Sequence, residues 1–397
     1  MEMDRTKKKL LFFVILFAMT AVFSRQSQAA GQKNSDIPLP ARIALSEAGK
    51  LMNRHSYDQA LEILRAFQAK CGSSSASYAE GCRHPEVFFA SGCCHMMKNR
   101  WKQAAEAFEQ TVKKDPAHVS AWLNLAKACY ELGDYSRAGH AFSKAYDSGS
   151  DKNPEHLYYS AAAYLMAKQP DPGIAAFEKL FRNHPGKVRT EWRENLVHAM
   201  LTANRQKQAL PHIRLLAEHY SGEKQVQWQE ILLHQYMQLG MRKEACNYAE
   251  FLTRQSPTCS KWWKALAHVE LQDSKHKSAL VALTIYSYLE SLSEQEAGLL
   301  ADLHMQVGIP SKAAPLYESS LRNRFDSRML QNFVIALQQT GQSEKALEVL
   351  KRFAPGSKEP EMLRLKNNLL YHIERTQETD RACGQMAKTA SRQGGPG

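Results

Sequence analysis

The amino-acid sequence predicts an all-α protein built as a solenoid of stacked helical hairpins. Residues 121–146 show the basic unit, which is two short helices joined at Gly133 with Ala138 and Phe142 on one face at helical spacing. Similar units recur along the chain at intervals of about 33–36 residues. Proline and glycine are sparse within the candidate helices and frequent between them. Because one hairpin cannot bury its own apolar face, the recurrence predicts an array in which neighbours cover each other.

Length and composition agree with a repeat array. The chain has 397 residues, more than a single hydrophobic core usually accommodates, and its 44% of apolar residues excludes general disorder. The formal net charge is +12, and loss of residues 1–29 would remove five basic and two acidic residues and leave +9. No Lys/Arg block with interleaved aromatic residues occurs in the body of the chain. The sequence therefore favours a solvated basic surface and predicts no nucleic-acid partner.

The amino terminus has the features of a secretory signal peptide. Basic residues precede an apolar run of 14 residues, 10–23, and small residues at positions 27 and 29 predict cleavage after Ala29. The run is short for a membrane span, which takes about 20 residues, so an uncleaved anchor is the alternative. The body of the chain has no Asn-x-Ser/Thr sequon, which favours bacterial export, to the periplasm, over a eukaryotic secretory route. Residues 30–40 are predicted to form a flexible lead.

The hairpins are predicted to fill residues 41–355 in nine consecutive units. One core position from each unit, in chain order, is Ala48, Phe88, Trp122, Leu157, Leu196, Leu232, Trp263, Leu300 and Phe333. The unit around Leu196 is weaker because it has no glycine at its turn. Residues 356–390 no longer fit the pattern and are predicted to form capping helices over the last open face. The polar, glycine-rich residues 391–397 are predicted to be a disordered tail.

The residue types at these spacings resemble the tetratricopeptide repeat (TPR) family. In the best unit the matching positions are Trp122, Leu125, Ala126, Gly133, Tyr135, Ala138, Phe142 and Ala145. The resemblance covers residues 41 to about 355. It implies a right-handed superhelix whose concave groove, lined by the first helix of each unit, binds a protein partner. One TPR subtype clamps the C-terminal carboxylate of its partner. Of the residues that this subtype uses, the chain has only Asn124, so the subtype is rejected.

The resemblance also implies which side chains would line the groove. With Trp122 as the fourth residue of its unit, the contact positions are the second, fifth, ninth, twelfth and thirteenth. The candidate groove residues on this count are Phe89, Met96, Met97, Leu123, Lys127, Tyr130, Tyr158, Leu165, Met166, His198, His234 and His268. The early units are apolar and Met-rich, which suits an extended peptide or an amphipathic helix. In the competing interpretation the superhelix itself or the amino-terminal segment covers the apolar positions, and the three histidines are solvated.

The cysteines indicate an oxidising compartment. The first two units are 44 residues apart instead of 34, and the additional residues fall between Cys71 and Cys82. In an exported protein we expect these two to form a disulfide that closes the insertion. Cys94 and Cys129, on adjacent first helices, are a second candidate pair, with small buried core residues as the alternative.

The sequence predicts a binding protein and not an enzyme. It has no HExxH, GxSxG, GxxxxGK[ST] or GxGxxG motif, and the repeats leave no room for a separate catalytic domain. We therefore expect a non-enzymatic scaffold of the bacterial envelope, with a protein partner and no cofactor or metal. Two alternatives stay open. One is a metal- or haem-handling protein that uses the three groove histidines and the clustered cysteines. The other is a membrane-anchored adaptor with an uncleaved amino terminus.

Overall fold

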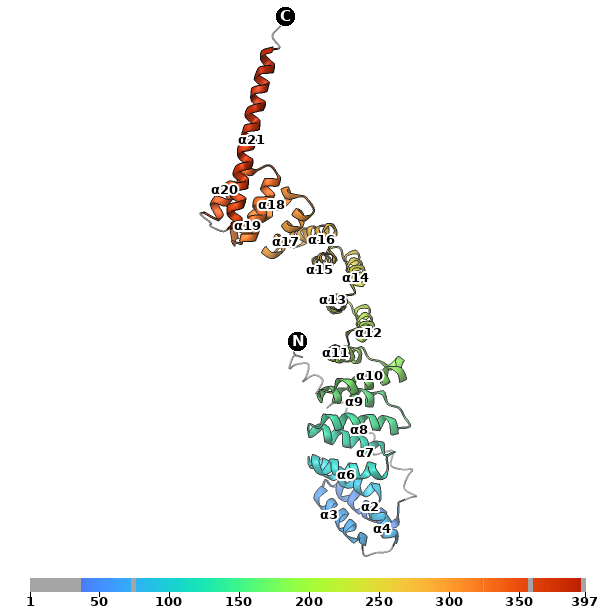
Figure 1. Ribbon diagram of the computed structural model, residues 1–397. Coiled ribbons are helices and arrows are strands. Elements are labelled where there is room, and N and C mark those ends of the chain that lie inside the picture. The colour runs from blue at the N-terminus through green and yellow to red at the C-terminus, as the bar shows by residue number, and fades with distance from the viewer. Residues whose placement is uncertain (1–36, 73–75, 324, 356–359, 394–397) are drawn as a thin grey trace. The chain divides into compact units, whose positions relative to one another are not determined.

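The computed structural model describes residues 37–72, 76–323, 325–355 and 360–393, and all its regular structure there is helical, with no strand (Figure 1). The predicted signal peptide and residues 30–36 of the predicted lead lie outside the described residues. The chain divides into two compact units, residues 1–229 and 230–397, and α13 crosses the boundary. We call these two parts unit 1 and unit 2. No helix in the described part of the chain is both long and apolar enough to cross a membrane.

The helices follow one another as nine consecutive pairs, with one short insertion and one long final helix. The pairs are α2 (Leu39–Asn53) with α3 (Tyr57–Ala69), α5 (Pro85–Met97) with α6 (Trp101–Lys114), α7 (Val119–Glu131) with α8 (Tyr135–Ser148), α9 (Pro154–Met166) with α10 (Pro170–Asn183), α11 (Thr190–Thr202) with α12 (Gln206–His219), α13 (Gly222–Gln238) with α14 (Arg242–Gln255), α15 (Ser260–Gln272) with α16 (His276–Leu289), α17 (Glu294–Gln306) with α18 (Pro310–Asn323), and α19 (Ser327–Gln339) with α20 (Ser343–Phe353). The predicted all-α, TPR-like array of about nine repeats is confirmed. Its right-handed superhelical path stays a prediction.

Each pair turns at a single residue in the left-handed backbone region. Glycine occupies this place in four pairs, and the other five use His55, Asn99, Lys168, Asn204 and Ser274. At the turn between α7 and α8, Gly133 has φ of 78°, and the N–H of Asp134 reaches back to the carbonyl of Cys129 at 2.9 Å. This bond satisfies a carbonyl that the helix end would otherwise leave unpaired. Asn204 explains how the unit around Leu196 turns without glycine, because asparagine tolerates this conformation.

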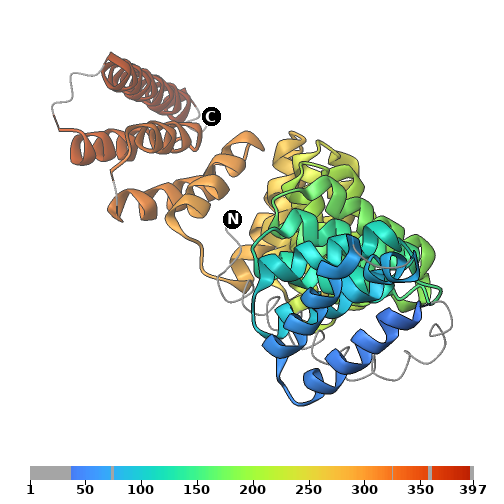
Figure 2. The same ribbon diagram turned by 90° about the horizontal axis from the view of Figure 1, so that it is seen from below.

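Small residues let neighbouring helices approach closely. A Cβ atom added to Gly92 would lie 2.6 Å from Cε1 of Phe108, a ring that is fully buried. In the best unit, Ala138 and Phe142 are buried, as the helical spacing predicts. Seen from below, the blue helices of the first pairs lie in front of the green ones of unit 1, because the pairs are stacked (Figure 2).

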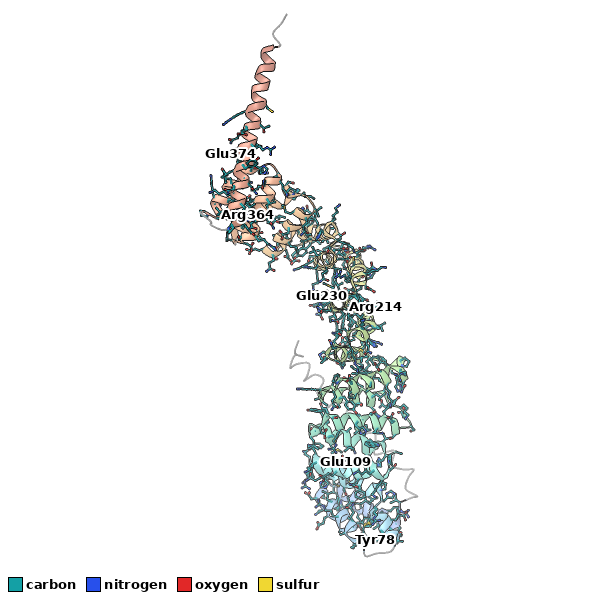
Figure 3. All side chains as sticks on the ribbon, viewed as in Figure 1. Tyr78, Glu109, Arg214, Glu230, Arg364 and Glu374 are labelled. Atoms are coloured by element: carbon teal, nitrogen blue, oxygen red, sulfur yellow. A yellow bond between two sulfur atoms is a disulfide. The ribbon has the colours of Figure 1, made fainter. Side chains whose placement is uncertain are left out.

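The insertion after the first pair is partly helical. We expected a polar loop between Cys71 and Cys82, and the structure instead forms the short helix α4 (Ala76–Cys82), which packs on α2. Tyr78, at the α2–α4 end of unit 1, lies against Phe67 with 5.0 Å between the ring centroids (Figure 3). Apolar contacts therefore explain why the segment orders, although its sequence is polar. The Cα atoms of Cys71 and Cys82 are 5.9 Å apart and the sulfur atoms are joined.

The carboxyl end, where we expected the capping helices of residues 356–390, forms one long helix, α21 (Pro360–Gln393). Met362 and Leu369 are buried in a core cluster with residues of α17, α18, α19 and α20. Leu370 and Tyr371, further along the same helix, are exposed. Figure 1 shows that the carboxyl-terminal part of α21 extends beyond the other helices of unit 2. The helix includes residues 391–393, which we expected to belong to a disordered tail. No proline interrupts the segment, so its polar composition does not end the helix.

Candidate partner-binding surface

The first helices of successive pairs lie side by side within each unit. In unit 1, Nδ2 of Asn124 on α7 lies 3.9 Å from Sγ of Cys93 on α5, and the ring of Tyr158 on α9 stacks on that of Trp192 on α11 at 5.1 Å. The first helices of neighbouring repeats therefore contact each other within unit 1. We call the surface formed by α5, α7, α9 and α11 the inner-helix surface of unit 1.

Seven of the predicted groove residues are at least partly accessible on this surface. Phe89, Leu123, Lys127, Leu165 and Met166 are half-buried, and Met97 and His198 are exposed. Five of the seven are apolar, and they come from three successive first helices: α5, α7 and α9. These three helices thus present a strip of apolar side chains, which the ammonium group of Lys127 interrupts.

Three other predicted residues are buried, which corrects their assignment as direct contacts. Met96 is 3% exposed, and Tyr130 and Tyr158 are each 5% exposed. Met96 and Tyr130 are in the last turn of their helices, where the second helix of the pair covers them, and Tyr130 lies 5.3 Å from Tyr135 between ring centroids. Burial raises the pKa of Tyr130 to about 12, and among the described residues its hydroxyl has no hydrogen-bond partner. These side chains fill the space between helices and do not face a partner.

Phe89 is held in place by a residue that the sequence analysis did not single out. Its ring lies 4.6 Å from the ring of His118 and 5.7 Å from that of Phe108. His118 is itself anchored, because Nδ1 accepts from the backbone N–H of Ala121 at 3.1 Å and Nε2 lies 3.4 Å from Oε1 of Glu86. Histidine is not among the preferred helix-capping residues, although His118 caps α7, and only the packing identifies it as a support for Phe89.

The α11 end of the same surface is charged. Oε1 of Glu194 accepts from the hydroxyl of Tyr220 at 2.6 Å and pairs with Lys224 at 2.7 Å. Arg189, just before α11, pairs with Glu155 at 2.8 Å and lies 4.8 Å above the ring of Trp192. Trp192 and Arg189 were not predicted, because neither is at one of the contact positions that the resemblance implies. The inner-helix surface of unit 1 is thus apolar from α5 to α9 and ionic at α11.

The first helices of unit 2 pair their charges with one another. Lys261 meets Glu230, labelled in Figure 3, at 2.7 Å, and Lys264 meets Glu296 at 2.5 Å. Asp302 accepts from the hydroxyl of Tyr317 at 2.6 Å and from Asn332 at 3.0 Å. Such polar groups satisfy each other, so this surface offers fewer apolar contacts than the one in unit 1.

The three predicted histidines do not form a metal site in the described residues. His198 belongs to unit 1 and His234 and His268 to unit 2, and all three are exposed. None of them, and none of the clustered cysteines, belongs to a group of three potential ligands close enough to share an ion. Burial raises the pKa of Cys93 to about 12 and that of Cys94 to about 11, which keeps these thiols protonated. Cys94 and Cys129 are both buried and unpaired, as the alternative interpretation expects.

Comparison with known proteins supports the repeat assignment. Two tetratricopeptide repeat models match the chain, one over residues 95–153 and one over residues 157–186. Neither is a model of an enzyme family, and no curated protein matches the sequence.

Solved TPR structures are similar at low sequence identity. The crystal structure of MamA protein is 16% identical, with 48% of this chain and 92% of that chain covered and a TM-score of 0.33. A tetratricopeptide repeat protein from Parabacteroides merdae ATCC 43184 is 13% identical over 64% of this chain and 98% of that one, with a TM-score of 0.30. The P58(IPK) TPR domain is 12% identical over 85% and 99%, with a TM-score of 0.24. No function is taken from these similarities. The chain is a TPR-like repeat array, and TPR models match it between residues 95 and 186.

Proposed function

We propose that the protein is a non-enzymatic interaction scaffold that binds an apolar peptide or amphipathic helix of a partner protein on the inner-helix surface of unit 1. TPR domains generally serve protein–protein interaction, which is the coarser part of this proposal. One observation carries the finer part. Five accessible groove residues of α5, α7 and α9 are apolar, whereas the equivalent positions of unit 2 pair their charges internally.

The chemistry of the strip suits a helical or extended partner. Met97 and Met166 have flexible, polarizable side chains that adapt to irregular apolar surfaces. Leu123 on α7 and Leu165 on α9 add aliphatic contacts, and Lys127 adds a positive charge to the strip. An amphipathic helix with apolar residues at i, i+3 and i+7 and an acidic residue beside them has this complementarity.

We further propose that the protein works in the bacterial envelope after export. The proposal rests on the predicted signal peptide, residues 1–29, and on the paired Cys71 and Cys82, which need an oxidising compartment. The intact mass of the exported protein tests this. Loss of residues 1–29 supports release into the periplasm, and retention of them supports the membrane-anchored alternative.

A site-specific crosslinking experiment tests the surface. A photoreactive amino acid replaces Leu123 in one variant and Leu215 in another; Leu215 is 47% exposed and lies on α12, away from the inner-helix surface. We expect one discrete crosslinked partner from the cell envelope with the probe at 123 and none with the probe at 215. In the chain without the photoreactive amino acid, Leu123→Glu should abolish capture of this partner, and Leu215→Glu should not. Equal capture by both variants would overturn the assignment of the surface.

A further inference from the structure

A compact group of ligating side chains lies in unit 2, away from the proposed partner surface. Cys246 and Glu250 are one turn apart on α14, and Glu270 is on α15. One potential ligand atom from each lies within 4.8 Å of the other two. This is the one such group of three in the described parts of the chain.

The potential ligand atoms lie close together, and Cys246 and Glu270 are buried. Sγ of Cys246 donates to Oε1 of Glu270 at 3.0 Å and lies 3.8 Å from Oε1 of Glu250. Zinc bond lengths of about 2.3 Å to sulfur and 2.1 Å to oxygen, in a tetrahedron, separate a sulfur from an oxygen ligand by about 3.6 Å. The observed separations bracket this value, so only small side-chain movements are needed to seat an ion.

Glu270 gives an independent sign that the group is incomplete. The residue is 4% exposed, and within the described residues no group donates a hydrogen bond to its Oε2. A buried carboxylate oxygen without a donor is costly, and native proteins normally avoid it. Within the described residues, Oε2 makes an ion-pair contact with Nζ of Lys275 at 3.4 Å.

The ammonium group of Lys275 is the alternative to a metal ion as the positive charge at this site. Its position leaves room for a metal ion. Its side chain is about half exposed, its closest contact is Asp273 at 2.9 Å, and it lies 4.0 Å from Sγ of Cys246. It can keep Asp273 while an ion takes the interior position. Glu250 behaves similarly, because its Oε2 binds Arg254 at 2.7 Å while Oε1 faces the cysteine.

We propose that Cys246, Glu250 and Glu270 bind one divalent transition-metal ion of the zinc class. The thiol proton leaves to solvent when the sulfur–metal bond forms, as metal binding to cysteine requires. The thiolate and two carboxylates then carry three negative charges, which the divalent ion and Lys275 together balance. A thiolate ligand selects against calcium and magnesium, which prefer oxygen ligands. Three protein ligands leave a fourth position for water, so the ion joins α14 to α15 at an open site.

From the sequence alone we expected no metal. Glu270 is 24 residues from the cysteine, in a different helical hairpin, and no known motif has that spacing. Only the packing of α14 against α15 brings the two together.

Cobalt titration of the purified full chain tests the proposal. Co²⁺ alone is added to metal-free protein, and the thiolate-to-cobalt charge-transfer band in the near ultraviolet is followed, then Zn²⁺ is added in competition. We expect a band that saturates at one ion per chain and is displaced by zinc. Cys246→Ser should abolish the band, and Cys259→Ser, which removes the nearest other thiol in sequence, should leave it unchanged.

A variant of one carboxylate ligand provides a second test that stays valid if the cysteine variant misfolds. Glu250→Gln alters the most accessible of the three ligands and is expected to weaken cobalt binding at least about tenfold while helix content, by circular dichroism, stays the same. Absence of the band in the folded wild-type chain would overturn the proposal. So would a band that survives Cys246→Ser, or an unchanged affinity in Glu250→Gln.

Discussion

The indole Nε1 of Trp122 donates a hydrogen bond to the carbonyl oxygen of Pro116 at 2.9 Å, and Trp263 makes the same contact with Pro257 at 2.7 Å. Each tryptophan occupies the fourth position of its repeat, and each proline lies in the loop that precedes the first helix of that repeat. The contact thus ties the start of a first helix to the connection from the previous pair. Two distant repeats use the same local device because the same residues recur at the same spacing.

Trp122→Phe tests the value of this bond. Phenylalanine keeps most of the ring contact and removes the donor, so we expect the free energy of unfolding of this region to fall by about 1 kcal/mol. Because repeat arrays can unfold in parts, amide hydrogen exchange within α7 and α8 is the appropriate measurement. Trp263→Phe should show an effect of similar size in α15 and α16. If protection within α7 and α8 does not change, the bond does not stabilise the repeat.

Two glycines in helices should respond to alanine in opposite directions. Gly92→Ala places a Cβ atom 2.6 Å from the buried ring of Phe108, so we expect a loss of about 1–3 kcal/mol. Gly49 on α2 has no atom within 4 Å of the added Cβ, so Gly49→Ala should raise stability by up to about 1 kcal/mol. Urea unfolding of the two variants beside the wild type measures both changes. A loss of stability in both variants would contradict the steric explanation.

Glu296 should make unit 2 sensitive to acid. Burial by itself raises the pKa of this carboxyl group, but Lys264 at 2.5 Å and the hydrogen bonds from Ser293 outweigh it and lower the pKa from 4.5 to about 2. A carboxylate with a lowered pKa stabilises the fold above its unfolded-state pKa, and this contribution is lost as the pH falls from about 5 towards 2. At pH 3 the loss amounts to about 2 kcal/mol.

Glu296→Gln tests this pH dependence. The variant should be less stable than the wild type at pH 7, and the difference between the two should shrink as the pH falls to 3. Thermal unfolding over this pH range gives both curves. Parallel curves for the two proteins would show that another group accounts for the acid sensitivity.

A thiol count tests the pairing of Cys71 with Cys82. The chain has eight cysteines, and six are free in the structure. Protein purified without reductant and unfolded in denaturant should therefore react with six equivalents of a thiol reagent, and with eight after reduction. Cys71→Ser combined with Cys82→Ser should lower the stability of the α2–α5 region by about 3 kcal/mol. Eight reactive thiols before reduction would contradict the disulfide.

The fold was predictable from the sequence because its determinants are local. The spacing of Ala138, Phe142 and their equivalents encodes a buried helical face, and one hairpin needs only its neighbours to bury it. The turn at Gly133 was equally plain. The turns at Lys168 and Ser274 were harder to predict, because lysine and serine have no preference for the left-handed backbone conformation. They adopt it because the packed helices on both sides require it.

The candidate site was predictable only in part. The contact positions lie on the first helices of the pairs, but they include Tyr130 and Tyr158, which are buried, and Leu123 and Met166, which are accessible. All four are large and apolar, so the sequence alone does not separate them. Their exposure depends on which side chain of the adjacent helix covers them, as Trp192 covers Tyr158.

The sequence by itself determined that this protein is an array of nine helical hairpins, because helix periodicity and repeat spacing are properties of neighbouring residues. Only the tertiary structure decided which side chains of that array are available. It left Phe89 and Leu123 half-buried on the inner-helix surface of unit 1 and brought Cys246 to 3.0 Å from Glu270. Both outcomes depend on side-chain packing between different helices, which residue spacing along the chain does not encode.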